Sequence, residues 1–155
     1  IIPAGGSSTI GVLGYVNAAL ELAEQVAAKA VPHPDRIYFS LGSMGTAAGL
    51  AIGLGLAGID AELHAVRVVD TRFGSREKLT GLVGATIARL REWIPDLPSL
   101  YPLRRVVVRD EFFGLRYGEF TESGVAAVHH AWRAAALCTS TWRRAARRSR
   151  ARRGR

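Results

Sequence analysis

The chain of 155 residues is poor in cysteine and has no long hydrophobic run. Its single cysteine, Cys138, cannot form an internal disulfide, and no Cys and His residues have the spacing of a metal site. We therefore expect a protein of the reducing cytoplasm without a metal. The longest weakly charged window, residues 42–58, is interrupted by glycines. It is also shorter than the ~20 residues of a membrane-spanning helix, so we expect no membrane partner.

The N-terminal residues also lack the features of a signal peptide. Residues 1–8 contain no initiator Met and no basic segment followed by an apolar one. The sequence therefore predicts a chain that starts at an internal position of a longer protein.

Acidic residues are absent from the C-terminal end of the chain. The segment Arg143–Arg155 contains eight arginines and no acid, so it accounts for the whole net charge of +8 and leaves residues 1–142 neutral. Such a block can bind nucleic acid nonspecifically, although no recognition helix or aromatic interleaving accompanies it. We expect residues 138–155 to be a disordered Arg-rich tail, and residues 1–137 to form the folded domain.

Apolar residues recur with the periods of helices and strands along residues 10–137. Three-to-four spacing predicts helices, and short apolar runs predict buried strands. The expected order is helix 10–30, strand 36–41, helix 45–57, strand 61–69, helix 75–94, strand 105–109 and helix 121–137. This alternation predicts an α/β protein with an open parallel sheet and helices on both faces. Ligands of such sheets bind at the carboxyl ends of the strands.

A glycine-rich turn follows the first expected strand, in the segment Phe39–Gly49. A strand that enters a helix through such a turn directs backbone N–H groups and the positive end of the helix dipole at one point, where a phosphate fits. Gly42 and Gly45 permit close approach, and Ser43 and Thr46 add hydroxyl donors on either side of Met44. The spacing alone leaves a second interpretation open, namely an ordinary tight connection with Thr46 as the helix cap.

Three segments together resemble a known family. They are Ile2–Leu22, Gly42–Leu50 and Arg116–Gly124, and in this order they are similar to the D-cysteine desulfhydrase and 1-aminocyclopropane-1-carboxylate deaminase family. These are fold-type-II pyridoxal-phosphate enzymes related to the tryptophan synthase β-subunit. Gly6 stands where the deaminase branch carries a cysteine, which favours the desulfhydrase branch.

The resemblance implies a cofactor, a reaction and site residues. Pyridoxal 5'-phosphate would be held through its phosphate by the turn, and the substrate would be a small amino acid such as D-cysteine, cleaved to sulfide, ammonia and pyruvate. It also implies that the loop Gly5–Ser8 borders the active site, that Tyr117 lies close to the substrate, and that the full-length protein is a homo-oligomer. The phosphate-binding residues would be Gly42, Ser43, Met44, Gly45 and Thr46.

The chain departs from the family pattern at two places. The family's cofactor-binding lysine lies in a preceding N-terminal region, and neither Lys29 nor Lys78 falls in a matching motif. Where the family carries a patterned segment with a second tyrosine, this chain reads Ser140-Thr-Trp-Arg-Arg144 and continues as a run rich in Arg and Ala. We expect a fragment lacking the N-terminal part that is inactive alone. The altered end matches out-of-frame translation, a hypothesis that the alternative reading frames of the gene would test.

Two other functions stay open. A Rossmann-type nucleotide-binding domain would use the same turn, but residues 42–47 lack the G-x-G-x-x-G spacing. Glu62 stands near the distance required for a ribose-binding acid, although a charge at the edge of a strand is the commoner reason for a glutamate there. The third possibility is nonspecific nucleic-acid binding through Arg143–Arg155.

Overall fold

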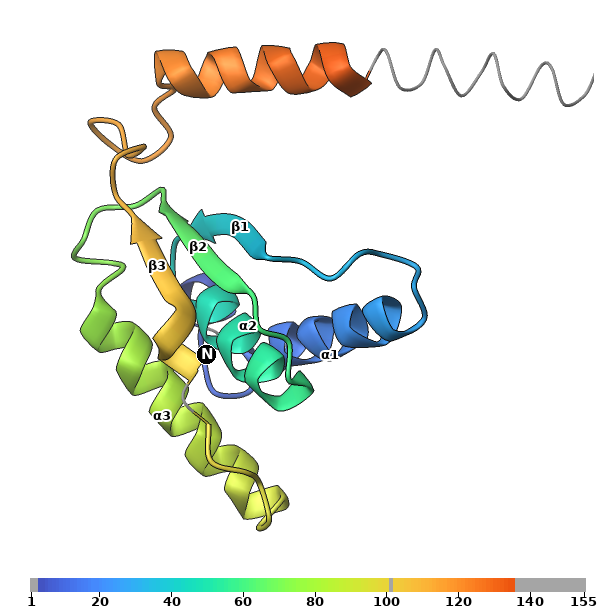
Figure 1. Cartoon of the computed structure of the whole chain (residues 1–155). Coiled ribbons are helices and arrows are strands. Elements are labelled where there is room, and N and C mark those ends of the chain that lie inside the picture. Colours follow the sequence, from blue (N-terminus) through green and yellow to red (C-terminus); the bar gives the residue numbers. More distant parts are fainter. Residues whose placement is uncertain (1–2, 101, 136–155) are drawn as a thin grey trace, which may run out of the picture. The chain divides into compact units, whose positions relative to one another are not determined.

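A computed structural model describes residues 3–100 and 102–135 (Figure 1). The chain divides into two compact units, Ile1–Gly118 and Glu119–Arg155. The expected domain boundary after residue 137 and the Arg-rich tail lie outside the described residues, so both stay predictions.

The described residues of the first unit form three parallel strands and three α-helices. The strands lie in the order β1-β2-β3, and each crossover between neighbours contains a helix, as in other parallel sheets. The elements are η1 (Ala4–Gly6), α1 (Leu13–Ala27), β1 (Arg36–Leu41), α2 (Gly45–Ala57), β2 (Glu62–Arg67), α3 (Arg76–Trp93), η2 (Pro102–Arg105) and β3 (Val106–Arg109). The α/β class, the open parallel sheet and the expected element order up to residue 109 are confirmed.

Helix α2 lies at the centre of the first unit. It packs against α1, α3 and strands β1 and β2. Apart from Thr46 it is built of Ala, Gly, Leu and Ile, so almost every side can be buried. Its contact with α1 depends on glycine. A Cβ atom added to Gly49 would lie 2.4 Å from the Tyr15 Cβ, and one added to Gly53 would lie 2.6 Å from the Ala19 Cβ. Only glycine allows the two helices to approach this closely.

The two faces of the sheet differ in character. Alternate strand residues contribute to the hydrophobic core that the helices share, and these are Ile37, Phe39, Leu41, Leu63, Ala65, Val106 and Val108. On the opposite face, Tyr38 and Ser40 are exposed. Charged side chains of the strands lie on this face too. The sequence predicted helices on both faces of the sheet. In the described part of this unit, helices cover one face.

The second unit is described for residues 119–135. Residues 122–135 are helical, which confirms the expected helix as far as it is described. Thr121 precedes this helix, and its Oγ1 accepts a hydrogen bond of 3.1 Å from the Gly124 N–H, as an N-cap does. Within the described ranges, no helix is both long and apolar enough to cross a membrane.

Candidate functional site

The glycine-rich turn lies at the carboxyl end of β1, where the sequence predicts a ligand site. Met44 adopts a left-handed conformation with φ 75°, and α2 starts at Gly45. Met44 occupies the N-cap position, and its own side chain makes no capping hydrogen bond. Thr46 is therefore not the helix cap, whereas the choice between a phosphate site and an ordinary tight connection stays a prediction.

The N-terminus of α2 keeps backbone donors available. The Gly45 N–H donates to the Ser7 Oγ at 3.0 Å, and the Ser7 Oγ donates to the Ser43 Oγ at 2.9 Å. The N–H groups of Thr46 and Ala47 have no acceptor within the described part of the chain. They border a cavity of about 150 Å³ that is lined by residues 40–47 alone. Free amides and a helix dipole directed at one small cavity suit an anion.

The N-terminal loop packs directly against this turn. Gly5 has φ 67°, and an added Cβ there would lie 2.0 Å from the Ser43 Oγ. A Cβ on Gly45 would lie 2.8 Å from the Ser7 Oγ. The two segments, more than thirty residues apart in the sequence, therefore form one structure through glycine contacts and serine hydroxyls.

A second and larger cavity of about 640 Å³ adjoins the turn. It shares Ser40, Gly42 and Ser43 with the smaller cavity. Its other lining residues come from the N-terminal loop, the segment after β2 and the segment after β3, and they are Pro3, Gly5, Val68, Val69, Phe73 and Tyr117. The structure thus brings Tyr117, which the family resemblance nominated, to the same cavity as the glycine-rich turn. The ring of Tyr117 is 75% exposed.

Arg67 is a residue of this region that the sequence analysis did not identify. It is the last residue of β2, its side chain is only 8% exposed, and its Nη1 donates to the Gly74 carbonyl at 2.6 Å. Its Nε forms an ion pair with Asp110, just after β3. In the sequence, an arginine at the end of an apolar run looks like a solvated charge. Only its burial in the folded protein distinguishes Arg67 from a solvated arginine.

Neither lysine lines the two cavities. Lys29 is exposed after the end of α1, with φ 58°. Lys78 lies in the first turn of α3, and its Nζ donates to the Arg72 carbonyl. Among the described residues no three His, Cys, Asp or Glu side chains come together as a metal site would require.

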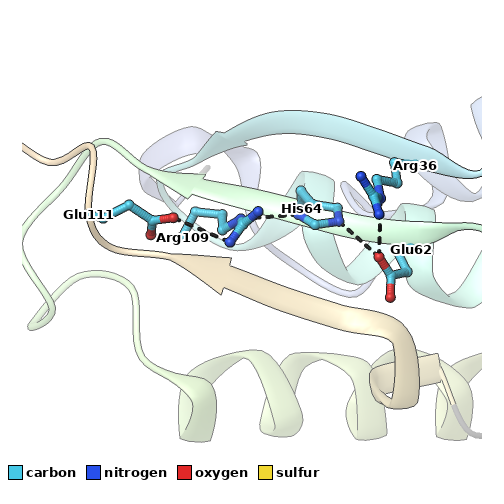
Figure 2. A network of polar contacts seen from close by, with 5 residues as sticks. All are labelled: Arg36, Glu62, His64, Arg109 and Glu111. Atoms are coloured by element: carbon cyan, nitrogen blue, oxygen red, sulfur yellow. Dashed lines mark hydrogen bonds and ion pairs between the residues drawn. The ribbon is translucent and has the colours of Figure 1, made fainter. Parts of the chain in front are cut away.

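A network of polar contacts lies on the face of the sheet opposite to α2 (Figure 2). It runs from Arg36 through Glu62, His64 and Arg109 to Glu111, and His64 also stacks on the ring of Tyr38. The hydrogen bond from His64 lowers the pKa of the Glu62 carboxyl, and Arg36 lowers it further by its charge. None of the five residues lines the cavities beside the turn. Glu62 is the first residue of β2, whereas the turn follows the last residue of β1, so they lie at opposite ends of parallel strands.

The residues present fit the phosphate of pyridoxal phosphate. The turn offers free amides, the hydroxyl of Thr46 beside the helix N-terminus, and a glycine at position 45 with no side chain over the helix end. Fold and turn together define an α/β protein with an anion-binding geometry at the carboxyl edge of a parallel sheet.

Comparison with known proteins identifies sequence relatives of this chain. The chain is 34% identical over 128 residues to the D-cysteine desulfhydrases of Yersinia pestis (strain Pestoides F), Serratia proteamaculans (strain 568) and Klebsiella pneumoniae (strain 342). This confirms the resemblance to the D-cysteine desulfhydrase family that the three motifs predict, and the chain is a sequence relative of these enzymes. The match covers 83% of this chain and 36% of each relative, so the chain spans little more than a third of their length. No protein-family model matches the chain.

Proposed function

We propose that the turn Gly42–Thr46 binds the phosphate of pyridoxal 5'-phosphate, as part of a lyase or deaminase that acts on a small amino acid such as D-cysteine. The observation that carries the proposal is the pair of free amides, Thr46 and Ala47, at the start of α2. They border the smaller cavity, which shares Ser40, Gly42 and Ser43 with the cavity that Tyr117 lines. The names of the relatives supply the substrate class.

Each residue of the site has a definable task. The amides at the N-terminus of α2 hold the phosphate, and the hydroxyls of Ser43 and Thr46 add donors. The cofactor, when bound, supplies an electron sink for the substrate's α-carbon. Tyr117 would hold or transfer a proton at the substrate through its hydroxyl. Val69 and Phe73 add apolar side chains to the lining of the larger cavity.

The 155-residue chain by itself should bind the cofactor weakly and show no turnover. A covalent link to pyridoxal phosphate needs a lysine, and neither Lys29 nor Lys78 lines a cavity beside the turn. The cytoplasmic location, the homo-oligomeric state of the full-length protein and nucleic-acid binding by Arg143–Arg155 stay predictions.

The Rossmann-type alternative requires an acidic residue at the nucleotide site. Glu62, the only candidate that the spacing offers, lies at the opposite end of its strand from the turn and pairs with Arg36 and His64. This placement favours the pyridoxal-phosphate proposal.

The proposal is tested by thermal unfolding with inorganic phosphate and with pyridoxal phosphate. At a hundredfold excess over Kd, binding stabilises the folded state by about 2.7 kcal/mol. Gly45→Val should abolish this protection because an added Cβ would lie 2.8 Å from the Ser7 Oγ, so the larger side chain forces the Ser7 loop and the start of α2 apart. Gly55→Val in the same helix is the matched control, since the nearest atom to an added Cβ there is the Leu100 Cδ2 at 3.5 Å. Equal protection of wild type and Gly45→Val by both ligands would refute the assignment.

A further inference from the structure

The ion pair of Arg67 and Asp110 joins two carboxyl strand ends beside the proposed phosphate site. Arg67 ends β2 and its Cα partner in the sheet is Leu41, the last residue before the turn. Asp110 directly follows β3. A guanidinium that is 8% exposed loses most of its hydration, so it requires close partners in the folded state.

Arg67 also anchors the segment that leads to α3. Its Nη1 donates to the Gly74 carbonyl at 2.6 Å. Gly74 is itself pressed against the turn, because an added Cβ would lie 2.7 Å from the Met44 Cε and 3.2 Å from the Gly42 carbonyl oxygen. The guanidinium therefore holds Gly74 against the wall of the turn.

These contacts fix the ends of the segments that line the larger cavity. Val68, Val69 and Phe73 lie between Arg67 and Gly74 in the sequence, and both ends of that segment are joined by the Arg67 hydrogen bond. Tyr117 follows Asp110 by seven residues, so the Arg67 ion pair fixes the start of its segment. One side chain thus connects the turn, the apolar wall and the tyrosine segment.

We propose that Arg67 is a positioning residue for the pyridoxal-phosphate site: it holds the segments after β2 and β3 beside the Gly42–Thr46 turn, so that Tyr117 and the turn share one cavity. The inference rests on the proposed function. Arginine suits the task because its planar fork makes two hydrogen bonds in different directions, whereas a lysine ammonium has one donor centre.

The test measures the affinity for pyridoxal phosphate by titration, at a temperature where every variant is folded. Arg67→Lys and Asp110→Asn should each weaken binding by about tenfold, because each loses one contact of the bridge. Asp60→Asn is the matched control. Asp60 is an exposed aspartate paired with Arg105 near the amino ends of the strands, and it lies outside the larger cavity. It should bind as tightly as the wild type.

A double-mutant cycle with Tyr117→Phe separates positioning from general stability. Tyr117→Phe should weaken binding in the wild type but have less effect in Arg67→Lys, where the tyrosine segment is no longer held. Three outcomes would each overturn this inference and leave the proposed function standing. The first is wild-type affinity in Arg67→Lys and Asp110→Asn, and the second is an equal loss of affinity in Asp60→Asn. The third is a Tyr117→Phe effect that is as large in Arg67→Lys as in the wild type. If the wild type binds neither phosphate nor pyridoxal phosphate, the proposed function fails and the inference fails with it.

Discussion

Replacing Gly53 with alanine should destabilise the protein, although alanine is the better helix former. In the middle of a helix, Gly→Ala is favourable by about 1 kcal/mol when the new methyl group has room. At Gly53 the added Cβ would lie 2.6 Å from both the Ala19 Cβ and the Val16 carbonyl oxygen. These atoms belong to α1 and include backbone, so the helices must separate rather than a side chain rotate.

The size of the expected destabilisation follows from these short distances. To restore an ordinary contact of about 3.4 Å, α1 and α2 must move apart by roughly 0.8 Å at this point. Overpacking of this kind costs about 1–3 kcal/mol. Because backbone atoms are involved, the upper part of that range applies, and the net loss after the helix-propensity gain is about 1–2 kcal/mol.

The assay is urea denaturation followed by circular dichroism, with the free energy of unfolding taken from midpoint and slope. Gly84→Ala in α3 is the control, because an added Cβ there has no atom within 4 Å. It should raise the free energy of unfolding by about 0.5–1 kcal/mol. A Gly53→Ala variant as stable as Gly84→Ala would refute the close packing of α1 on α2.

Three further outcomes are expected. Glu62 has a lowered pKa because of its hydrogen bond with His64, so its carboxylate contributes stability above its usual pKa that is lost as the pH falls through the lowered one. Acid titration of unfolding should therefore show a slightly steeper loss for the wild type than for Glu62→Gln, and identical curves would remove Glu62 from the network. Deleting residues 143–155 should leave the melting temperature unchanged and abolish salt-sensitive retention on DNA; a large drop in melting temperature would show that these residues pack. The purified chain should release neither sulfide nor ammonia from D-cysteine, and release that is lost on borohydride reduction with a label on Lys29 or Lys78 would identify that lysine as the cofactor's covalent partner.

Most of the fold was predictable from local patterns in the sequence. α1 and α3 were predictable from their three-to-four apolar spacing, α2 from its Ala, Leu and Gly composition, and the strands from their short apolar runs. The turn after β1 was predictable because its glycines and hydroxyl residues lie close together in the sequence. Tyr117 was nominated by family resemblance alone, since nothing in its local sequence indicates a cavity.

Contacts between residues far apart in the sequence have no local pattern from which they could be predicted. The hydrogen bond of Ser7 with Ser43 joins residues 36 apart, and the Arg67 ion pair joins residues 43 apart. An arginine at a strand end looks the same in the sequence whether it is solvated or buried. The polar face of the sheet was also missed, because β1 was interpreted as a strand buried on both sides, whereas exposed and partly buried residues alternate along it.

The central claim is that the amides of the Gly42–Thr46 turn bind phosphate. The most direct measurement is a titration of the isotope-labelled chain with inorganic phosphate and then with pyridoxal phosphate, followed by backbone amide chemical shifts. We predict that the largest and saturable shifts fall on residues 42–47, with those of Thr46 and Ala47 moving downfield as their free N–H groups gain an acceptor. Shifts confined to Arg143–Arg155, with the turn unchanged, would contradict the account.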